Sequence, residues 1–208
     1  MKSKMKTAAL LKEYIFRLIN EELREKRLRI FDFDDTLVIT DAKIYVKNLE
    51  TGDNFVLSPG EFAVYEKKTG DEFDFSDFQK LINPRAITWT GKIIRNIYNK
   101  YGPSGFVILS ARTSAVPIHQ FLDDAGMPGI EIVALNNADP NAKAQKVDEW
   151  ITQKDLDVVE FFDDSHKNIA AVKALSKKHP DVKIIGRLVV HTHIPTHGFT
   201  RNYRKTKS

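Results

Sequence analysis

The feature that most limits the fold of this chain is a regular alternation of helical and strand-like segments between residues 87 and 190. Apolar residues at helical spacing predict four helices, over 89–101, 116–125, 139–151 and 166–178. Short runs rich in Val, Ile and Phe predict four strands, over 106–109, 130–135, 158–162 and 182–190. Since such alternation forms right-handed βαβ crossovers, the sequence predicts an α/β fold with a three-layer, Rossmann-like parallel sheet.

Three further segments precede this alternation. Leu28 to Phe33 is a short apolar run followed by a polar turn, which predicts a buried strand that carries carboxylates at its end. Residues 41–80 alternate apolar side chains with Gly-containing turns, which predicts a small β-rich insertion; the alternating residues are Ile44, Val46, Phe55, Leu57, Phe62 and Val64. Apolar residues at helical spacing from Leu10 to Leu23 predict an N-terminal helix. We therefore expect a single domain over residues 1–208, with the insertion inside it.

The amino-acid composition excludes several kinds of reactive group and bears on the cellular location. The chain contains no cysteine, which excludes disulfides, thiolate nucleophiles, iron–sulfur clusters and cysteine-ligated zinc. Demanding chemistry must then come from carboxylates, hydroxyls, His, Lys or a bound cation. The apolar stretch Ala8–Leu11 is too short for a signal peptide or a membrane span. We expect a cytoplasmic protein with no membrane partner.

Carboxylates follow two of the predicted strands, and a Ser and an Arg follow a third. Asp32, Asp34 and Asp35 come after the first strand, Ser110 and Arg112 after the strand over 106–109, and Asp163 and Asp164 after the strand over 158–162. Because parallel strands end at a common edge, these side chains should converge. Crowded carboxylates there would each cost several kcal/mol unless a cation or fixed donors compensated them. A hard divalent cation with oxygen ligands, Mg²⁺, fits this need.

The order of these motifs resembles the phosphatases of the haloacid dehalogenase superfamily. The shared pattern is a strand followed by Asp-x-Asp-x-Thr, a strand ending in Ser, a lysine on a helix and a strand ending in Asp-Asp, and it spans about Arg29 to Val190. The resemblance implies that Asp32 is a nucleophile that forms an aspartyl-phosphate, and that Asp34 is the general acid and base. An acid at position 34 implies phosphate chemistry rather than carbon–halogen chemistry.

The same resemblance assigns substrate contacts. Ser110 would bind the phosphoryl oxygens, and Thr36 would hold the catalytic loop beside the substrate. Arg112 would either touch a substrate phosphate or form a surface ion pair. A helical lysine would neutralise the nucleophile and the phosphoryl group; Lys143 is favoured because it lies in the first helical turn, and Lys146 is the alternative.

The implied magnesium site draws on Asp32, Asp34, Asp163 and Asp164, but the last motif aligns in two ways. In one alignment Asp163 meets the metal and Asp164 pairs with the lysine. In the other Asp164 is the ligand and Asn168 stands where the family has a second acid, as an orienting group. Separately, His191, His193 and His197 alternate along a strand end, where they could bind a transition metal or simply be polar.

Substrate class is suggested by charge and by the size of the insertion. Residues 1–29 hold nine Lys and Arg against four Glu, and residues 187–208 hold five against no acid; such ends could attract a polyanion or merely keep the chain soluble. In the family such insertions form caps, and a small cap leaves the site open to a large substrate.

A fainter resemblance points to nucleic-acid ends. Ile82-Asn83-Pro84, before a helix and the Ser110 motif, is similar to the phosphatase half of polynucleotide kinase-phosphatases, although no kinase phosphate loop is present. We expect a 3′-phosphatase of nucleic-acid ends. The alternatives are a phosphatase of nucleotides or small metabolites, and a nucleic-acid-binding module on an inactive scaffold.

Overall fold

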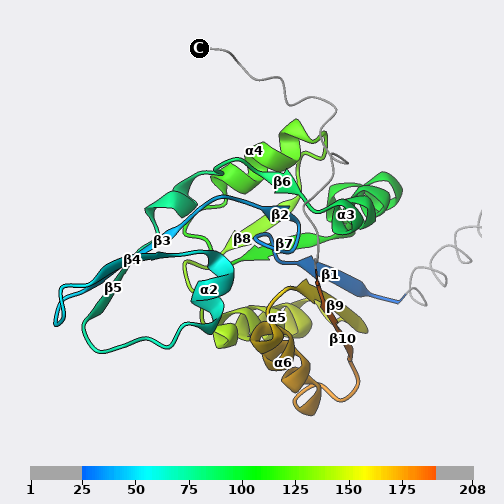
Figure 1. The fold of residues 1–208 in the computed structure, drawn as a ribbon. Coiled ribbons are helices and arrows are strands. Elements are labelled where there is room, and N and C mark those ends of the chain that lie inside the picture. The colour runs from blue at the N-terminus through cyan, green and yellow to red at the C-terminus, as the bar shows by residue number, and fades with distance from the viewer. Residues whose placement is uncertain (1–24, 191–208) are drawn as a thin grey trace, which may run out of the picture.

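A computed structural model describes residues 25–190 of the chain (Figure 1). The predicted N-terminal helix, the three histidines after residue 190 and the basic tail lie outside the described residues. Within the described part, no helix is both long enough and apolar enough to cross a membrane.

The core of the fold is a five-stranded parallel sheet in the order β10-β9-β1-β7-β8. Its strands are β1 (Arg27–Phe31), β7 (Val107–Ser110), β8 (Glu131–Ala134), β9 (Val158–Asp163) and β10 (Lys183–Leu188). The central strands β1, β7 and β9 are almost entirely buried, as expected for a parallel sheet covered on both faces. The prediction of an α/β fold built on a parallel sheet is therefore confirmed.

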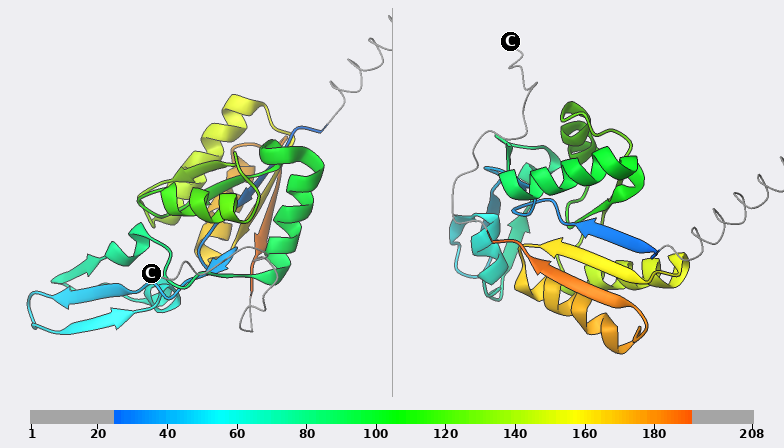
Figure 2. Two further views of the ribbon diagram at one scale, coloured as in Figure 1. Left: turned by 90° about the horizontal axis from the view of Figure 1, so that it is seen from above. Right: turned by 90° about the vertical axis from the view of Figure 1, so that its right-hand side faces the viewer.

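Helices cover both faces of this sheet (Figure 2). They are α3 (Thr88–Tyr101) and α4 (Val116–Asp124) on one face, and α5 (Pro140–Lys154) and α6 (His166–Ala174) on the other. Phe31 and Ile108 pack with the apolar sides of α3 and α4, while Leu109 and Phe161 pack with those of α5 and α6. The alternate inward and outward side chains of the strands thus supply two separate cores, one for each layer of helices.

The start of α5 follows the sequence signal closely. The Asp139 side chain accepts a hydrogen bond from the Asn141 backbone N–H at 2.9 Å, and Pro140 occupies the first helical position. The α6 helix begins in a similar way, with the Ser165 hydroxyl accepting from the Asn168 backbone N–H. Both caps lie at the carboxyl edge of the sheet, so they fix where the first turns of these helices stand.

The insertion forms a second, antiparallel sheet in the order β4-β3-β5, which projects from the body (Figure 1). Its elements are β3 (Ile44–Asn48), β4 (Asn54–Leu57), the short helix α2 (Pro59–Val64), β5 (Asp71–Asp74) and the 3-10 turn η1 (Ser76–Gln79). Phe62 and Val64, which the sequence places in a strand, lie in α2 instead. The reason is a capping box, because Ser58 and Glu61 exchange side-chain and backbone hydrogen bonds around Pro59.

Aromatic rings fill one side of this small sheet. Phe62 of α2 meets Phe73 of β5 and Phe75, with ring centroids 5.3 Å apart in both pairs, and Tyr65 meets Phe55 of β4. Two further short strands, β2 (Val38–Ile39) and β6 (Arg85–Ala86), pair antiparallel where the chain enters and leaves the insertion. This pairing ties both ends of the insertion to the body beside the end of β1.

Candidate active site

The candidate site lies where the connections from two neighbouring strands leave on opposite faces of the sheet. The chain after β1 leads to α3 on one face, whereas the chain after β9 leads directly to α6 on the other. In open α/β sheets such a switch point is where ligands bind. Asp32 follows β1, and its backbone N–H donates to the Phe162 carbonyl of β9 at 2.9 Å, so the carboxylates after both strands are held side by side.

A buried lysine from α5 joins the two strand ends. The Nζ of Lys143 lies 2.6 Å from Oδ1 of Asp32 and 2.8 Å from Oδ2 of Asp163, and all three side chains are buried. Lys146, one turn later, instead pairs with Glu149 at 2.9 Å and is partly exposed. Of the two lysines that the sequence offers, Lys143 is the one in the site.

Asp163 and Asp164 have different surroundings. Asp163 is fully buried and accepts hydrogen bonds from the Ser165 backbone N–H at 2.8 Å and from Nδ2 of Asn168 at 2.9 Å, besides its pair with Lys143. Asp164 is partly exposed, and its backbone N–H donates to Oγ1 of Thr36 at 3.1 Å. The lysine thus bonds to Asp163 and not to Asp164, and Asn168 orients Asp163.

Three carboxylates converge closely enough to share a cation. One oxygen from each of Asp32, Asp163 and Asp164 lies within 4.8 Å of the others. Burial raises the pKa of Asp32, and the charges of Asp163 and Asp164 add to this effect against the attraction of Lys143. Burial and the charge of Asp163 raise the pKa of Asp164 to about 7. The oxygen-only donor set and the mutual repulsion of the carboxylates fit a hard divalent cation such as Mg²⁺.

The side chain of Asp34, which the sequence analysis also assigned to the magnesium site, is not one of these three converging carboxylates. Its carboxylate accepts two hydrogen bonds from the Arg112 guanidinium, at 2.8 Å from Nε and 2.7 Å from Nη2. The remaining nitrogen, Nη1, donates to the backbone carbonyls of Phe78 at 2.7 Å and Lys80 at 3.1 Å. Arg112 is therefore neither a surface ion pair nor open to a phosphate; it fastens Asp34 to the end of the insertion.

Thr36 and Ser110 occupy structural positions beside the carboxylates. Thr36 is fully buried; its hydroxyl binds Asp164, and its carbonyl accepts from Oγ1 of Thr90 on α3 at 2.7 Å. Thr36 thus braces the loop after β1 against the loop after β9 and against α3, in line with the expected role of holding the catalytic loop. Ser110 ends β7, next to β1, and its hydroxyl accepts the Arg112 backbone N–H at 3.2 Å.

Two contributors to the site have no clear signal in the sequence. Thr90 supports Thr36 from across the insertion, 54 residues away, and nothing distinguishes it from other threonines in a helical first turn. Asp35 adopts a left-handed backbone conformation with φ of 54°, which lets the chain turn so tightly that Leu37 N–H reaches the Phe33 carbonyl at 2.9 Å. A preference of Asp for this conformation is a weak signal that the sequence does contain.

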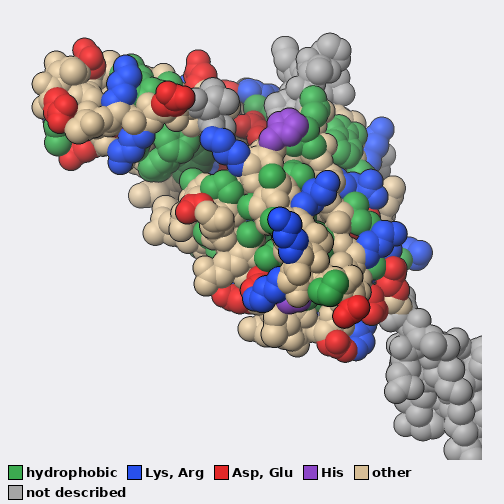
Figure 3. All heavy atoms as spheres, turned by 90° about the horizontal axis from the view of Figure 1, so that it is seen from below, with side chains coloured by type: hydrophobic (Ala, Val, Ile, Leu, Met, Phe, Trp, Pro, Cys, Tyr) green, Lys and Arg blue, Asp and Glu red, His purple; other side chains and the backbone are tan. Residues whose placement is uncertain are grey.

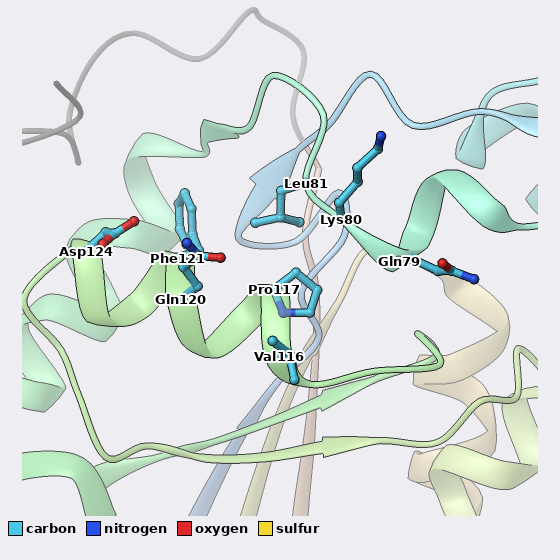
Figure 4. A pocket seen from close by; sticks show the side chains of 8 residues that line it. All are labelled: Gln79, Lys80, Leu81, Val116, Pro117, Gln120, Phe121 and Asp124. Carbon is cyan, nitrogen blue, oxygen red and sulfur yellow. The ribbon is translucent and has the colours of Figure 1, made fainter. Parts of the chain in front are cut away.

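A pocket of about 220 Å³ lies between the segment that leaves the insertion and α4 (Figure 4). Its lining residues are Gln79, Lys80, Leu81, Val116, Pro117, Gln120, Phe121 and Asp124. None of them is a carboxylate of the converging group, and the volume is below the range of roughly 300–1,000 Å³ that is usual for a small-molecule site. The pocket is therefore not part of the site formed by the three converging carboxylates.

Comparisons with known proteins leave this geometry as the main guide to function. No family model matches the chain, and no curated protein matches it either.

Proposed function

We propose that this chain is a magnesium-dependent phosphomonoester hydrolase that acts through an aspartyl-phosphate on Asp32. The observation that carries the proposal is the sharing of one buried ammonium, that of Lys143, by Asp32 and Asp163, with Asp164 within 4.8 Å of both carboxylates. The motif order that resembles haloacid dehalogenase phosphatases supports the same assignment. A purely structural role would not need this many acids at the strand ends.

In the first step Asp32 attacks the phosphorus atom of the substrate. Lys143 binds Oδ1 of Asp32, which leaves the other oxygen of the carboxylate for the attack. The new bond joins Asp32 to phosphorus, the bond from phosphorus to the leaving oxygen breaks, and Asp34 in its acid form gives its proton to that oxygen. One of the two hydrogen bonds between Asp34 and Arg112 must open for this transfer.

In the second step water hydrolyses the aspartyl-phosphate. Asp34, now a carboxylate, takes a proton from the water as the water oxygen attacks phosphorus, and inorganic phosphate leaves while Asp32 is restored. Lys143 stays beside Asp32 and offsets negative charge on the phosphoryl group in both steps. Mg²⁺, held by Asp32, Asp163 and Asp164, would supply further stabilisation of that charge.

The decisive test is Asp32→Asn, with Asp181→Asn as a matched control on the exposed surface. We expect Asp32→Asn to abolish hydrolysis of 4-nitrophenyl phosphate in Mg²⁺ while the unfolding curve stays cooperative, because an amide cannot attack phosphorus. The control should keep wild-type turnover. Mass spectrometry of acid-quenched wild-type protein should find a phosphoryl group on Asp32. Near wild-type turnover by Asp32→Asn would remove the nucleophile assignment.

The substrate class needs a separate comparison. We propose nucleic-acid 3′-ends as the substrates, with nucleotides and other small metabolites as the alternative. Rates on 3′-phosphorylated oligonucleotides, 5′-phosphorylated oligonucleotides and mononucleotides should be compared in Mg²⁺ and in EDTA. A clear preference for mononucleotides would favour the metabolite phosphatase, and binding of oligonucleotides without any turnover would favour the inactive binding module.

A further inference from the structure

Positive charge is concentrated in one region of the described chain. Residues 166–187, which form α6, the 3-10 turn η3 (Leu175–Lys177) and β10, carry six Lys and Arg against one Asp. The whole described part, residues 25–190, carries 22 Lys and Arg against 25 Asp and Glu. A basic segment from α6 to β10 therefore stands on a body that is otherwise acidic, and such an asymmetry attracts polyanions.

Three exposed basic residues follow one another along α6 and the turn after it. His166 and Lys173 lie seven residues apart on one side of α6, and Lys177 lies in η3, which continues the helix; we call these three residues the basic row. The positions between them on this side are filled by Ala170 and Ala174, both small and exposed. At 1.5 Å per residue the basic row is about 16 Å long. Figure 3, seen from the side of α6, shows Lys and Arg side chains gathered over this part of the surface.

The lysines of this face are available to a ligand. No carboxylate of the described residues lies within ion-pair distance of Lys167, Lys173 or Lys177, whereas Lys178 on the neighbouring side is paired with Asp148 at 2.6 Å. The stem of Lys173 lies close to the sheet. A Cβ at Gly186 of β10 would lie 3.0 Å from Cδ of Lys173, so the missing side chain lets the lysine stem pack on the sheet while its ammonium stays in water.

The basic row starts at the candidate active site. α6 begins directly after Asp163, Asp164 and Ser165, and Asn168 in its first turn binds Asp163 at 2.9 Å. His166 is thus at the carboxylate end of the row, and Lys177 is at the far end. A chain of anions whose first member lay at Asp32 would pass His166 and then meet the ammonium groups of Lys173 and Lys177 in order.

We propose that the basic row binds the phosphodiester backbone of a single nucleic-acid strand whose terminal phosphate enters at Asp32. The inference rests on the proposed phosphatase function, and it identifies a polymer as the substrate. At about 16 Å the row is long enough to contact more than one phosphate of the same strand. The row has no large apolar side chain, which disfavours insertion into a membrane surface. A phosphomonoester at the end of a phosphodiester chain matches both the site and the row.

The experiment compares Lys173→Gln/Lys177→Gln with Lys92→Gln/Lys100→Gln, an equal loss of charge from exposed positions on α3, across the sheet. Fluorescence anisotropy of a labelled single-stranded oligonucleotide with a 3′-phosphate would be measured in the full chain carrying Asp32→Asn, so that turnover does not interfere. Removing two phosphate contacts should make the slope of log K against log salt shallower by about 1.4. Between about 50 and 200 mM salt, the control should then lose about sevenfold more affinity than the Lys173 and Lys177 variant.

The catalytic readout uses the same variants with an intact Asp32. We expect the Lys173 and Lys177 variant to lose most of its advantage in kcat/KM for the oligonucleotide over the mononucleotide, while turnover of 4-nitrophenyl phosphate stays at the wild-type level.

Equal salt slopes for the two double variants would overturn the assignment of the basic row, and equal competition by poly-glutamate would assign the row to acidic proteins instead. These outcomes differ from failure of the phosphatase proposal. If the phosphatase proposal fails, the wild type hydrolyses no phosphomonoester. The proposed entry of a terminal phosphate at Asp32 would then be rejected even if the basic row binds the strand.

Discussion

Arg112→Gln is the substitution whose effect the structure defines most sharply. The Arg112 side chain is 1% exposed, and its guanidinium makes four hydrogen bonds, two to Asp34 and two to the backbone carbonyls of Phe78 and Lys80. Removing one partner of a buried ion pair lowers the free energy of unfolding by about 3–5 kcal/mol. Because the Asp34 side chain is 20% exposed, water recovers part of this loss, and we expect about 3 kcal/mol.

Urea unfolding followed by circular dichroism measures this difference directly. For a chain of this size, about 3 kcal/mol corresponds to a fall in the melting temperature of roughly 6–12 °C. The matched control is Arg85→Gln, since Arg85 also pairs with an aspartate, Asp41, at 2.7 Å, but both side chains are 41% exposed. An exposed pair contributes little, so the control should unfold close to the wild type.

Steady-state kinetics distinguish two possible roles of Arg112, which are to position Asp34 and to contact the substrate. If Arg112 holds Asp34 in place, Arg112→Gln lowers kcat for 4-nitrophenyl phosphate and leaves KM nearly unchanged, because the loss falls on proton transfer. The reasoning is refuted if Arg112→Gln unfolds like Arg85→Gln. A raised KM with an unchanged kcat would restore Arg112 to the role of a substrate ligand.

Three further predictions concern the carboxylate group. Lys143→Met should abolish turnover of 4-nitrophenyl phosphate, whereas Lys146→Met should leave it unchanged, since only Lys143 reaches Asp32. Mg²⁺ at a hundred times its dissociation constant should stabilise the fold by about 2.7 kcal/mol in thermal unfolding, Asp164→Asn should reduce this gain, and Ca²⁺ should inhibit hydrolysis. The pKa of Asp164 is raised from 3.8 to about 7 in the folded protein, so the folded state holds this proton more tightly than the unfolded state. Metal-free protein should therefore lose stability through this group as pH rises from about 4 to 7, by at most about 4 kcal/mol, and Asp164→Asn should remove that slope from urea titrations.

The repeating part of the fold is predictable because each of its elements carries its own periodicity. The expected helix over 89–101 is α3 (Thr88–Tyr101), and the expected strand over 158–162 is β9 (Val158–Asp163). The insertion is harder, because α2 has only six residues, fewer than two helical turns. Phe62 and Val64 happen to continue the alternation of apolar residues that is typical of a strand. The capping sequence Ser58-Pro59-Gly60-Glu61 nevertheless predicts the start of a helix.

The sequence predicts those parts of the site that lie directly at the ends of parallel strands. Asp32, Asp163 and Asp164 meet because parallel strands bring their carboxyl ends to one edge. Lys143 and Lys146 lie three residues apart and so on nearly the same side of α5, and only the position of the helix start decides between them. Arg112 was beyond prediction, since its direction depends on backbone carbonyls at Phe78 and Lys80 that the insertion brings from 34 and 32 residues away.

The charge balance of the buried groups separates the candidate site from the structural ion pairs of the same chain. Arg112 and Asp34 are matched one to one, and Glu160 on β9 is surrounded by Arg27, Arg29 and Arg187 at 3.0, 3.6 and 3.1 Å. At the ends of β1 and β9 the balance is reversed, because three carboxylates converge and the one ammonium among them, that of Lys143, bonds to two of them. Uncompensated charge at low exposure lowers stability, and a fold that balances its acids elsewhere has no structural reason to leave this excess. The excess is therefore best explained by positive charge that arrives with a ligand, which is the role that the proposed function gives to a divalent cation.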